Sequence, residues 1–248
     1  DGDDDRDPAD GGPAPSPVAG EVLDTRTVDA PSKPYAVEQD HLILVDTGEH
    51  VARVLHVDPA VSAGDRVAAG DSLGRLIRSG FFAPWVDDHV HLGFRPSEAN
   101  HYRASGSLRL ELGADVRPVR WDGTGTVVET GGTYVVLDAP AHPDQGNRFA
   151  GVAATVEGTA SVLDGGFPHY EGGGVLGGAA GPVAFLGRRV GTSDGRTVTW
   201  DEVAVRANGE PITGLSLFCG RDSVGVKLVC PDHGFAVGDR VDVAVARD

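Results

Sequence analysis

The sequence predicts an all-β protein of two domains, an open β-sandwich followed by a second β-rich domain of the sandwich or barrel type. Short runs rich in Val, Ile, Leu and Thr recur along the chain, and Gly, Asp or Pro separates them. Helical spacing of apolar residues, at every third and fourth position, is not sustained in any stretch. With 248 residues, 40% of them hydrophobic, the chain is long enough to build two cores.

The first domain is expected over residues 16–106. Residues 1–15 are rich in Asp, Gly and Pro without apolar periodicity, so they are predicted to form a flexible acidic lead. The pair Gly64-Asp65 is typical of a turn that leads into a strand. Six strands are expected in this domain, at residues 18–27, 41–46, 51–57, 66–67, 72–77 and 89–94.

The second domain is expected over residues 107–248, with the same alternation of short apolar runs and turns. Its strands are predicted at residues 125–129, 133–137, 151–156, 183–186, 197–205, 215–219, 224–230 and 240–245. A glycine-dense stretch, residues 164–178, is predicted to interrupt them as a loop.

The charge composition limits the possible partners. Asp and Glu number 37 and Lys and Arg only 21, and just two of the basic residues, Lys33 and Lys227, are lysines. Such a surface is typical of proteins that work in concentrated salt, so we expect a halophilic source and leave open whether the protein acts in the cytoplasm or at the cell envelope. A net charge of −16 argues against nucleic acid as a partner. No apolar run approaches the roughly 18–20 residues of a membrane span, and the composition does not indicate an oligomeric state.

One short stretch carries residues suited to metal chemistry. His89 and His91 are separated by one residue on a predicted strand, so their imidazoles point to the same face. Two imidazoles placed this way can share a metal ion, or one can bind the metal while the other acts on a substrate.

The order of motifs around these histidines resembles the M23 (lysostaphin-like) zinc metallopeptidases. That family has a Tyr-x-His-Leu strand, then a Gly-Asp-x-Val turn that ends in Leu-Gly or Ile-Gly, then a His-Leu-His-Phe-Glu strand. His56 stands at the position of the first motif, residues 64–74 match the turn closely, and residues 89–95 match the last strand loosely. Upstream, residues 16–22 are similar to a further strand of the family, so the resemblance spans about a third of the chain.

The resemblance implies an open β-sandwich that hydrolyses peptide bonds by zinc-activated water. It implies that His91 is a zinc ligand and that His56 and His89 are catalytic, and its substrate would be a peptide or a polymer of the cell envelope. Since metal-binding imidazoles must be neutral, zinc affinity should fall below a pH of about 6.5.

The family's other two zinc ligands, a His-x-x-x-Asp pair, should precede Ser16, but the first histidine of this chain is His41. Two interpretations stay open: the pair lies upstream of Asp1, or this is a non-catalytic copy. The alternative functions are accordingly a peptide-binding or glycan-binding module and a structural module of the cell envelope.

Two further places are candidate binding positions. Trp85, shortly before the paired histidines, is a candidate wall of a substrate cleft. His169, Tyr170 and Glu171 place an imidazole, a phenol and a carboxylate on the glycine-rich stretch, where the backbone can approach a ligand closely.

Overall fold

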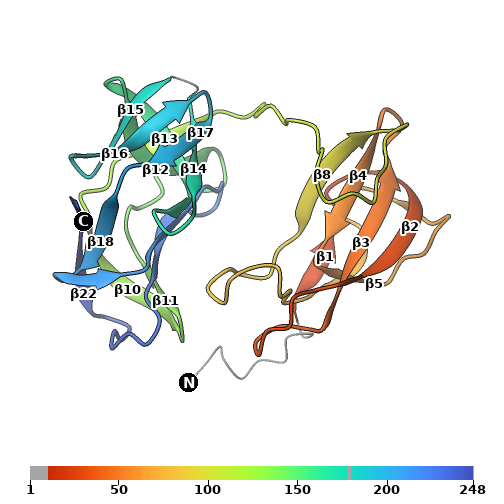
Figure 1. The fold of residues 1–248 in the computed structure, drawn as a ribbon, viewed down its shortest axis with the longest axis horizontal. Helices are drawn as coiled ribbons and strands as arrows, with labels where there is room; N and C mark the ends of the chain where they lie inside the picture. The colour runs from red at the N-terminus through yellow and green to blue at the C-terminus, as the bar shows by residue number, and fades with distance from the viewer. Residues whose placement is uncertain (1–10, 178–179, 248) are drawn as a thin grey trace. The chain divides into compact units, whose positions relative to one another are not determined.

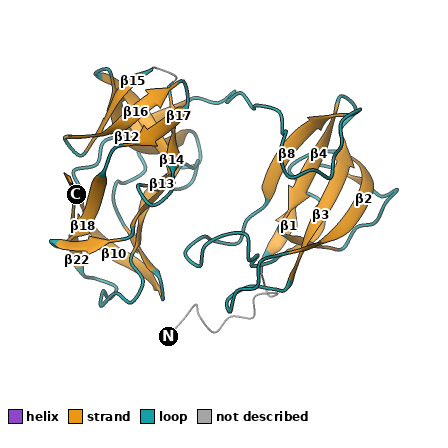
Figure 2. Ribbon diagram, in the orientation of Figure 1, coloured by secondary structure: helices purple, strands orange, loops and turns teal. Residues whose placement is uncertain are grey.

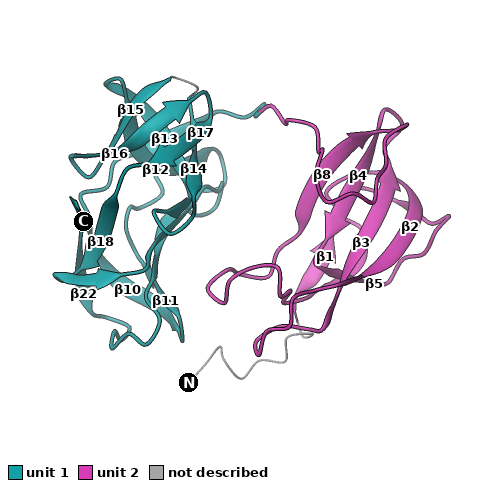
Figure 3. Ribbon diagram, viewed as in Figure 1, with its two compact units in different colours: residues 1–3, 112–248 teal, residues 4–111 magenta. Residues whose placement is uncertain are grey.

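The computed structural model describes residues 11–177 and 180–247 of the chain. It confirms the all-β prediction, because these residues form strands β1 to β22 and no helix (Figure 2). Nothing in the described part of the chain therefore qualifies as a helix that could span a membrane. The strands fall into two compact units that divide between Glu111 and Leu112, whereas the predicted domain limit followed Gly106 (Figure 3).

The N-terminal unit contains two sheets (Figure 1). One is five-stranded, in the order β6-β2-β3-β4-β8, and the other is three-stranded, in the order β1-β7-β5. The strands are β1 (Pro13–Pro15), β2 (Gly20–Asp29), β3 (Gln39–Asp46), β4 (His50–Leu55), β5 (Val57–Pro59), β6 (Arg66–Val67), β7 (Ser72–Leu76) and β8 (His91–Pro96).

The two sheets of this unit share one apolar core. Ile43 and Val45 on β3 pack in it with Ala14 of β1 and Leu73 of β7. Each aliphatic side chain buried in this way contributes about 1.5–3 kcal/mol. Because successive side chains of a strand point to opposite faces, Leu42 and Leu44 lie on the other face of the large sheet, where they form a second buried cluster. Strand β3 is therefore buried on both faces, which explains its uninterrupted apolar run.

The prediction that residues 1–15 form a flexible lead was wrong for the last residues of this segment. Residues 1–10 lie outside the described residues, but Pro13–Pro15 form β1, which pairs antiparallel with β7. Ala14 of this strand is completely buried. A strand of Pro-Ala-Pro has too few apolar side chains to be recognised from sequence, and its partner strand and buried alanine stabilise it.

The C-terminal unit is built on one continuous hydrogen-bonded network of 14 strands. Within it, β12, β15, β16, β17, β14 and β13 follow one another as neighbours, and a further pairing of β13 with β12 closes them into a ring. The strands are β9 (Val116–Val119), β10 (Thr124–Gly131), β11 (Tyr134–Leu137), β12 (Phe149–Val156), β13 (Thr159–Phe167), β14 (Gly172–Leu176), β15 (Gly181–Phe185), β16 (Arg188–Asp194), β17 (Thr197–Trp200), β18 (Val203–Ala207), β19 (Glu210–Ile212), β20 (Gly214–Phe218), β21 (Gly225–Val229) and β22 (Arg240–Arg247).

The glycine-dense stretch is not a plain loop. It contains the end of β13 and the whole of β14, and Gly173 explains why glycine is needed there. A Cβ atom on Gly173 would lie 2.0 Å from Cζ2 of Trp200, so the indole packs directly against the backbone of the strand. Glycine in this strand serves close packing of an aromatic ring, which composition alone does not reveal.

The predicted single strand at residues 197–205 is divided in two. Strand β17 pairs with β14 and β16 in the ring, whereas β18 pairs with β19 and β22. The chain leaves the ring after Trp200, where the amide of Asp201 still donates to the carbonyl of Val190 at 2.9 Å. The pattern of apolar residues continues across this change of partner, so the sequence shows one run.

Candidate metal centre

The pairing of β4 with β8 brings three histidines together. Leu55, the last residue of β4, lies opposite His91, the first residue of β8. His56 follows β4 directly, and His89 stands two residues before β8. The three imidazoles each offer a nitrogen within 4.8 Å of the others, so the structure assembles the three histidines of the predicted catalytic and metal positions.

Aromatic contacts hold the three rings in place. The ring centroid of His56 lies 5.1 Å from that of His89 and 5.8 Å from that of His91. Phe82 packs against two of them, at 5.3 Å from His56 and 5.0 Å from His89. The rings meet edge to face or at a tilt, which is the favoured arrangement of aromatic groups.

A buried carboxylate, Asp40 at the start of β3, fixes the orientation of His56. Its side chain is completely buried, and Nδ1 of His56 donates to Oδ2 of Asp40 at 2.6 Å. Ser79 donates its hydroxyl to the same oxygen at 2.5 Å. The backbone amides of His41 and His56 donate to Oδ1 at 2.6 and 3.0 Å. Four hydrogen bonds thus satisfy the buried charge, as a carboxylate removed from water requires.

The hydrogen bonds also determine which ring nitrogens are available to a metal. A carboxylate and a carbonyl can only accept, so the proton of His56 is on Nδ1 toward Asp40, and that of His89 is on Nδ1 toward the carbonyl of Asp87 at 2.8 Å. Both histidines therefore keep Nε2 as the nitrogen with a free lone pair. Second hydrogen bonds of this kind orient most histidines that bind metals in proteins.

The backbone at His56 has an unusual conformation. Its φ angle of 68° lies in the left-handed region, which costs a side-chain-bearing residue on the order of 1–2 kcal/mol. Two hydrogen bonds hold this conformation. The amide of His56 donates to Asp40, as described above, and the carbonyl of His56 accepts from the amide of Ile77 at 3.1 Å. Strained residues that the surroundings hold in place are found preferentially at functional sites.

The electrostatics of the cluster favour a charged Asp40 carboxylate and a neutral His91 imidazole. Burial raises the pKa of Asp40, but the hydrogen bonds from His56 and Ser79 outweigh it and the pKa lies below its usual value. Burial, followed by the electrostatic influence of His56, His89 and Arg53, lowers the pKa of His91. Neutral imidazole is the form that binds a metal ion.

The histidines line a pocket of about 410 Å³, a volume within the range of small-ligand sites. Its lining residues all belong to the N-terminal unit. They are Val28, Leu42, Arg53, Leu55, His56, Phe81, Phe82, His89, His91, Tyr102 and Ala104. The pocket lies on the face of the large sheet that carries Leu42 and Leu55, opposite to the shared core. A mainly apolar hollow therefore opens beside the imidazole nitrogens.

The other predicted site residues are not part of this cluster. Trp85 lies half-buried between β7 and β8, and Phe81 and Phe82 line the pocket in its place. His169, Tyr170 and Glu171 lie between β13 and β14 in the C-terminal unit, where the rings of His169 and Tyr170 are 4.5 Å apart. Burial lowers the pKa of His169.

Sequence analysis did not find Asp40, Ser79 and Phe82. Asp40 is 16 residues away from His56 along the chain, and the only signal of its role is an acidic residue two positions before the apolar run that starts at Leu42. Aspartate at that place is equally typical of a turn.

Together, the fold and the cluster define a two-domain all-β protein with a three-histidine site in its N-terminal domain. The family model for the N-terminal domain of a domain of unknown function (DUF8155) matches residues 7–112, and the model for its C-terminal domain matches residues 117–246. The chain belongs to the DUF8155 family, and the two matches meet where the structure divides into its two units. Comparison with curated proteins and with solved structures gave no match.

Proposed function

We propose that the N-terminal domain binds one zinc ion through His56, His89 and His91 and hydrolyses peptide bonds. The resemblance to the M23 peptidases suggests the hydrolysis and His91 as a ligand, whereas His56 and His89, which it casts as catalytic, are added as ligands because of their positions beside His91. The observation that carries the proposal is that Asp40 and the carbonyl of Asp87 each hold Nδ1 of a histidine, which leaves Nε2 of both free beside His91. Catalytic zinc sites commonly have three protein ligands and keep a further position open.

The three imidazoles suit zinc in number and nearly in spacing. Zinc-to-nitrogen bonds measure about 2.0–2.1 Å, so two nitrogens on one ion are at most about 4.2 Å apart. The widest separation of the ligand atoms is 4.8 Å or less, and small rotations of the rings would close the difference. This set would supply three ligands without the His-x-x-x-Asp pair that the resemblance implies.

Each residue of the cluster then has a definite task. A bound zinc ion would supply Lewis-acid activation of water at neutral pH. Asp40 holds His56 in one tautomer, Phe82 fixes the planes of two rings, and the apolar walls of the pocket limit access of bulk water. Hydrolysis adds one water across the peptide C–N bond and releases a carboxylate and an amine.

Zinc content is the first test of this proposal. After dialysis, the protein is expected to retain about one zinc ion per chain, and the His91→Ala variant is expected to lose it because two imidazoles hold zinc weakly. The matched control is His50→Ala, at the opposite end of β4. Metal would be measured by mass spectrometry, and cleavage of a peptide mixture by the same method. Zinc retained by His91→Ala, or none bound by the original protein, would disprove the site. Bound zinc without cleavage would instead indicate a binding module.

The acidic composition predicts stabilisation by salt. With 37 acidic and 21 basic residues, the folded chain concentrates negative charge that salt screens. We expect the thermal unfolding midpoint to rise steadily as potassium chloride increases from about 0.2 M to about 3 M, since the Debye length falls over this range. Circular dichroism would measure it. A midpoint that falls or does not change would argue against adaptation to salt.

A further inference from the structure

One buried charge in the pocket has no partner among the residues that the structure describes. Arg53 stands in the middle of β4 and points to the pocket face, with only 6% of its surface exposed. Its Nε is enclosed and has no hydrogen-bond partner among the described residues, and none of their carboxylates pairs with it. Burying a guanidinium without a counter-charge costs desolvation free energy. A residue of this kind therefore suggests that a bound ligand supplies the missing negative charge.

The surroundings of Arg53 add positive charge. Arg95 lies on the same face, and its guanidinium already donates to the carbonyl oxygens of Arg103 at 2.7 Å and Ser105 at 2.5 Å. Arg26 lies over the ring of Tyr102, 4.1 Å from its centroid. Burial, and after it the charge of Arg95, lowers the pKa of Arg53.

Acidic groups are absent from the described residues that line the pocket, although a carboxylate there could pair with Arg53. The chain has 37 acidic residues, yet none lines the pocket in the part of the chain that the structure describes. The two acids that contact lining residues through hydrogen bonds are already engaged, because Asp24 accepts the hydroxyl of Tyr102 at 2.9 Å and Asp40 accepts the hydrogen bonds described above. The pocket is thus a positively charged hollow in an acidic protein, suited to an anionic ligand.

We infer that Arg53 binds a carboxylate group of the substrate, so that the site acts on peptides beside a free carboxylate. This inference rests on the proposed zinc-dependent hydrolysis and names its substrate class. Arg53 lies opposite Gly93, and His91 is therefore its diagonal neighbour, at a distance on the order of 7–8 Å. An extended peptide covers that distance with about two residues. A carboxylate on Arg53 would then place a peptide bond one or two residues away beside the histidines, and the apolar walls would accept the side chain between them.

Binding of small ligands to the metal-free protein separates this inference from the zinc site. The probes are N-acetylphenylalanine, its C-terminal amide, and the α-amide of N-acetylglutamate, whose only carboxylate is on the side chain. Ligand-observed NMR at one fixed salt concentration would measure their dissociation constants. We expect N-acetylphenylalanine to bind at least about tenfold more tightly than its amide, since a charged hydrogen bond gives a preference of this size. The glutamate probe shows whether the site prefers a terminal or a side-chain carboxylate.

Variants assign the preference to Arg53. Arg53→Gln should abolish it, Arg53→Lys should keep part of it because the charge remains, and the exposed Arg66→Gln should keep all of it. Unfolding curves of each variant show whether it is folded. Equal binding of acid and amide by the original protein, or an undiminished preference in Arg53→Gln, overturns the inference. If that happens while zinc still binds at one ion per chain, the zinc site stands and only the substrate class is wrong. A carboxylate preference in a protein that binds no zinc would refute hydrolysis but not the carboxylate site.

Discussion

Replacing Asp40 with alanine is expected to lower zinc affinity by about 10- to 100-fold, although Asp40 would not touch the metal. The carboxylate holds His56 through Nδ1 at 2.6 Å and also accepts the backbone amide of the same residue. Without it, the ring can rotate or change tautomer, and Nε2 is no longer held beside His89 and His91. Affinity for zinc falls because the site must then be ordered at the moment of binding.

The same substitution should lower the free energy of unfolding of the N-terminal unit by about 3–5 kcal/mol, because each buried donor that loses its acceptor costs about 1–3 kcal/mol. Asp40 is completely buried, and its loss leaves the hydroxyl of Ser79 and two backbone amides without an acceptor. Zinc competition with a chelator would measure the affinity, and denaturant unfolding the stability. Asp58→Ala is the control, because this aspartate on β5 has a side chain that is 65% exposed. A change of affinity below about twofold would mean that Asp40 does not orient the ligand.

The three histidines could be identified from the sequence because the patterns that mark them lie within short segments. Two histidines one residue apart on a strand must share a face, and the order of motifs joined His56 to them. Sequence analysis could not identify Asp40 or Ser79, because strand pairing brings these residues to the site. The register that pairs Leu42 with Leu55 and Leu55 with His91 cannot be deduced from any short segment of the sequence. The sequence therefore predicted the three histidines of the cluster and missed the groups that orient them.

The strands also divide into those that short segments of the sequence predict and those that they do not. Strands with a continuous apolar run, such as β3, were predicted because burial alone selects their residues. Strands β1 and β14 were not, because Pro-Ala-Pro and Gly-Gly-Gly sequences have few apolar side chains. Their stability comes from partner strands and from rings that pack on their backbones, as Trp200 does on Gly173. The role of Arg53 was missed for a similar reason, since an arginine in an apolar run gives no sign in the sequence that it faces a pocket.

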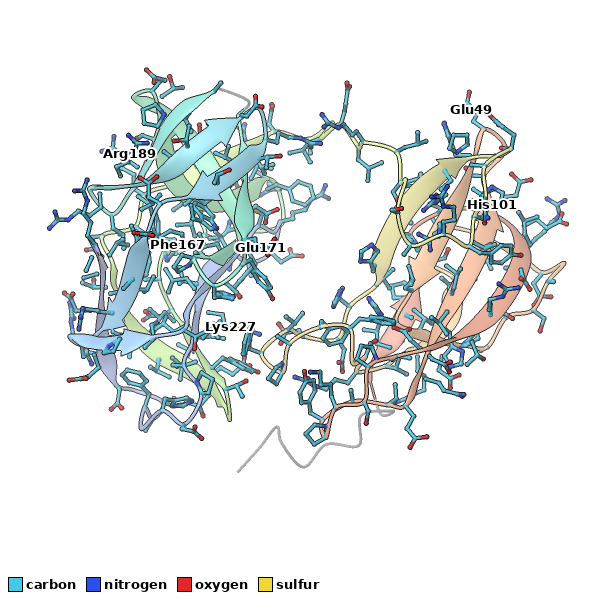
Figure 4. All side chains as sticks on the ribbon, viewed as in Figure 1. Glu49, His101, Phe167, Glu171, Arg189 and Lys227 are labelled. Atoms are coloured by element: carbon cyan, nitrogen blue, oxygen red, sulfur yellow. The ribbon has the colours of Figure 1, made fainter. Side chains whose placement is uncertain are left out.

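Replacing Phe167 with alanine is expected to lower the free energy of unfolding of the C-terminal unit by about 3–5 kcal/mol. Phe167 ends β13 at the point where this strand leaves the ring and pairs with β20. Figure 4 labels this residue among the side chains of the C-terminal unit. Its side chain is 1% exposed, and its ring meets those of Trp200 at 4.9 Å and Phe185 at 5.8 Å, edge to face. A cavity there would remove contacts in the ring and in the adjoining sheet together.

This variant also tests where the metal chemistry is located. The three histidines, Asp40 and Ser79 all belong to the N-terminal unit, so zinc content and zinc affinity should be unchanged in Phe167→Ala. Unfolding would be followed by the fluorescence of Trp121 and Trp200, which pack against the C-terminal core, with the half-exposed Val128→Ala as control. A loss of stability below about 1 kcal/mol would show that the core relaxes around the cavity. A loss of zinc from the folded variant would mean that the C-terminal unit contributes to the metal site, contrary to the assignment of all its ligands to residues 56–91.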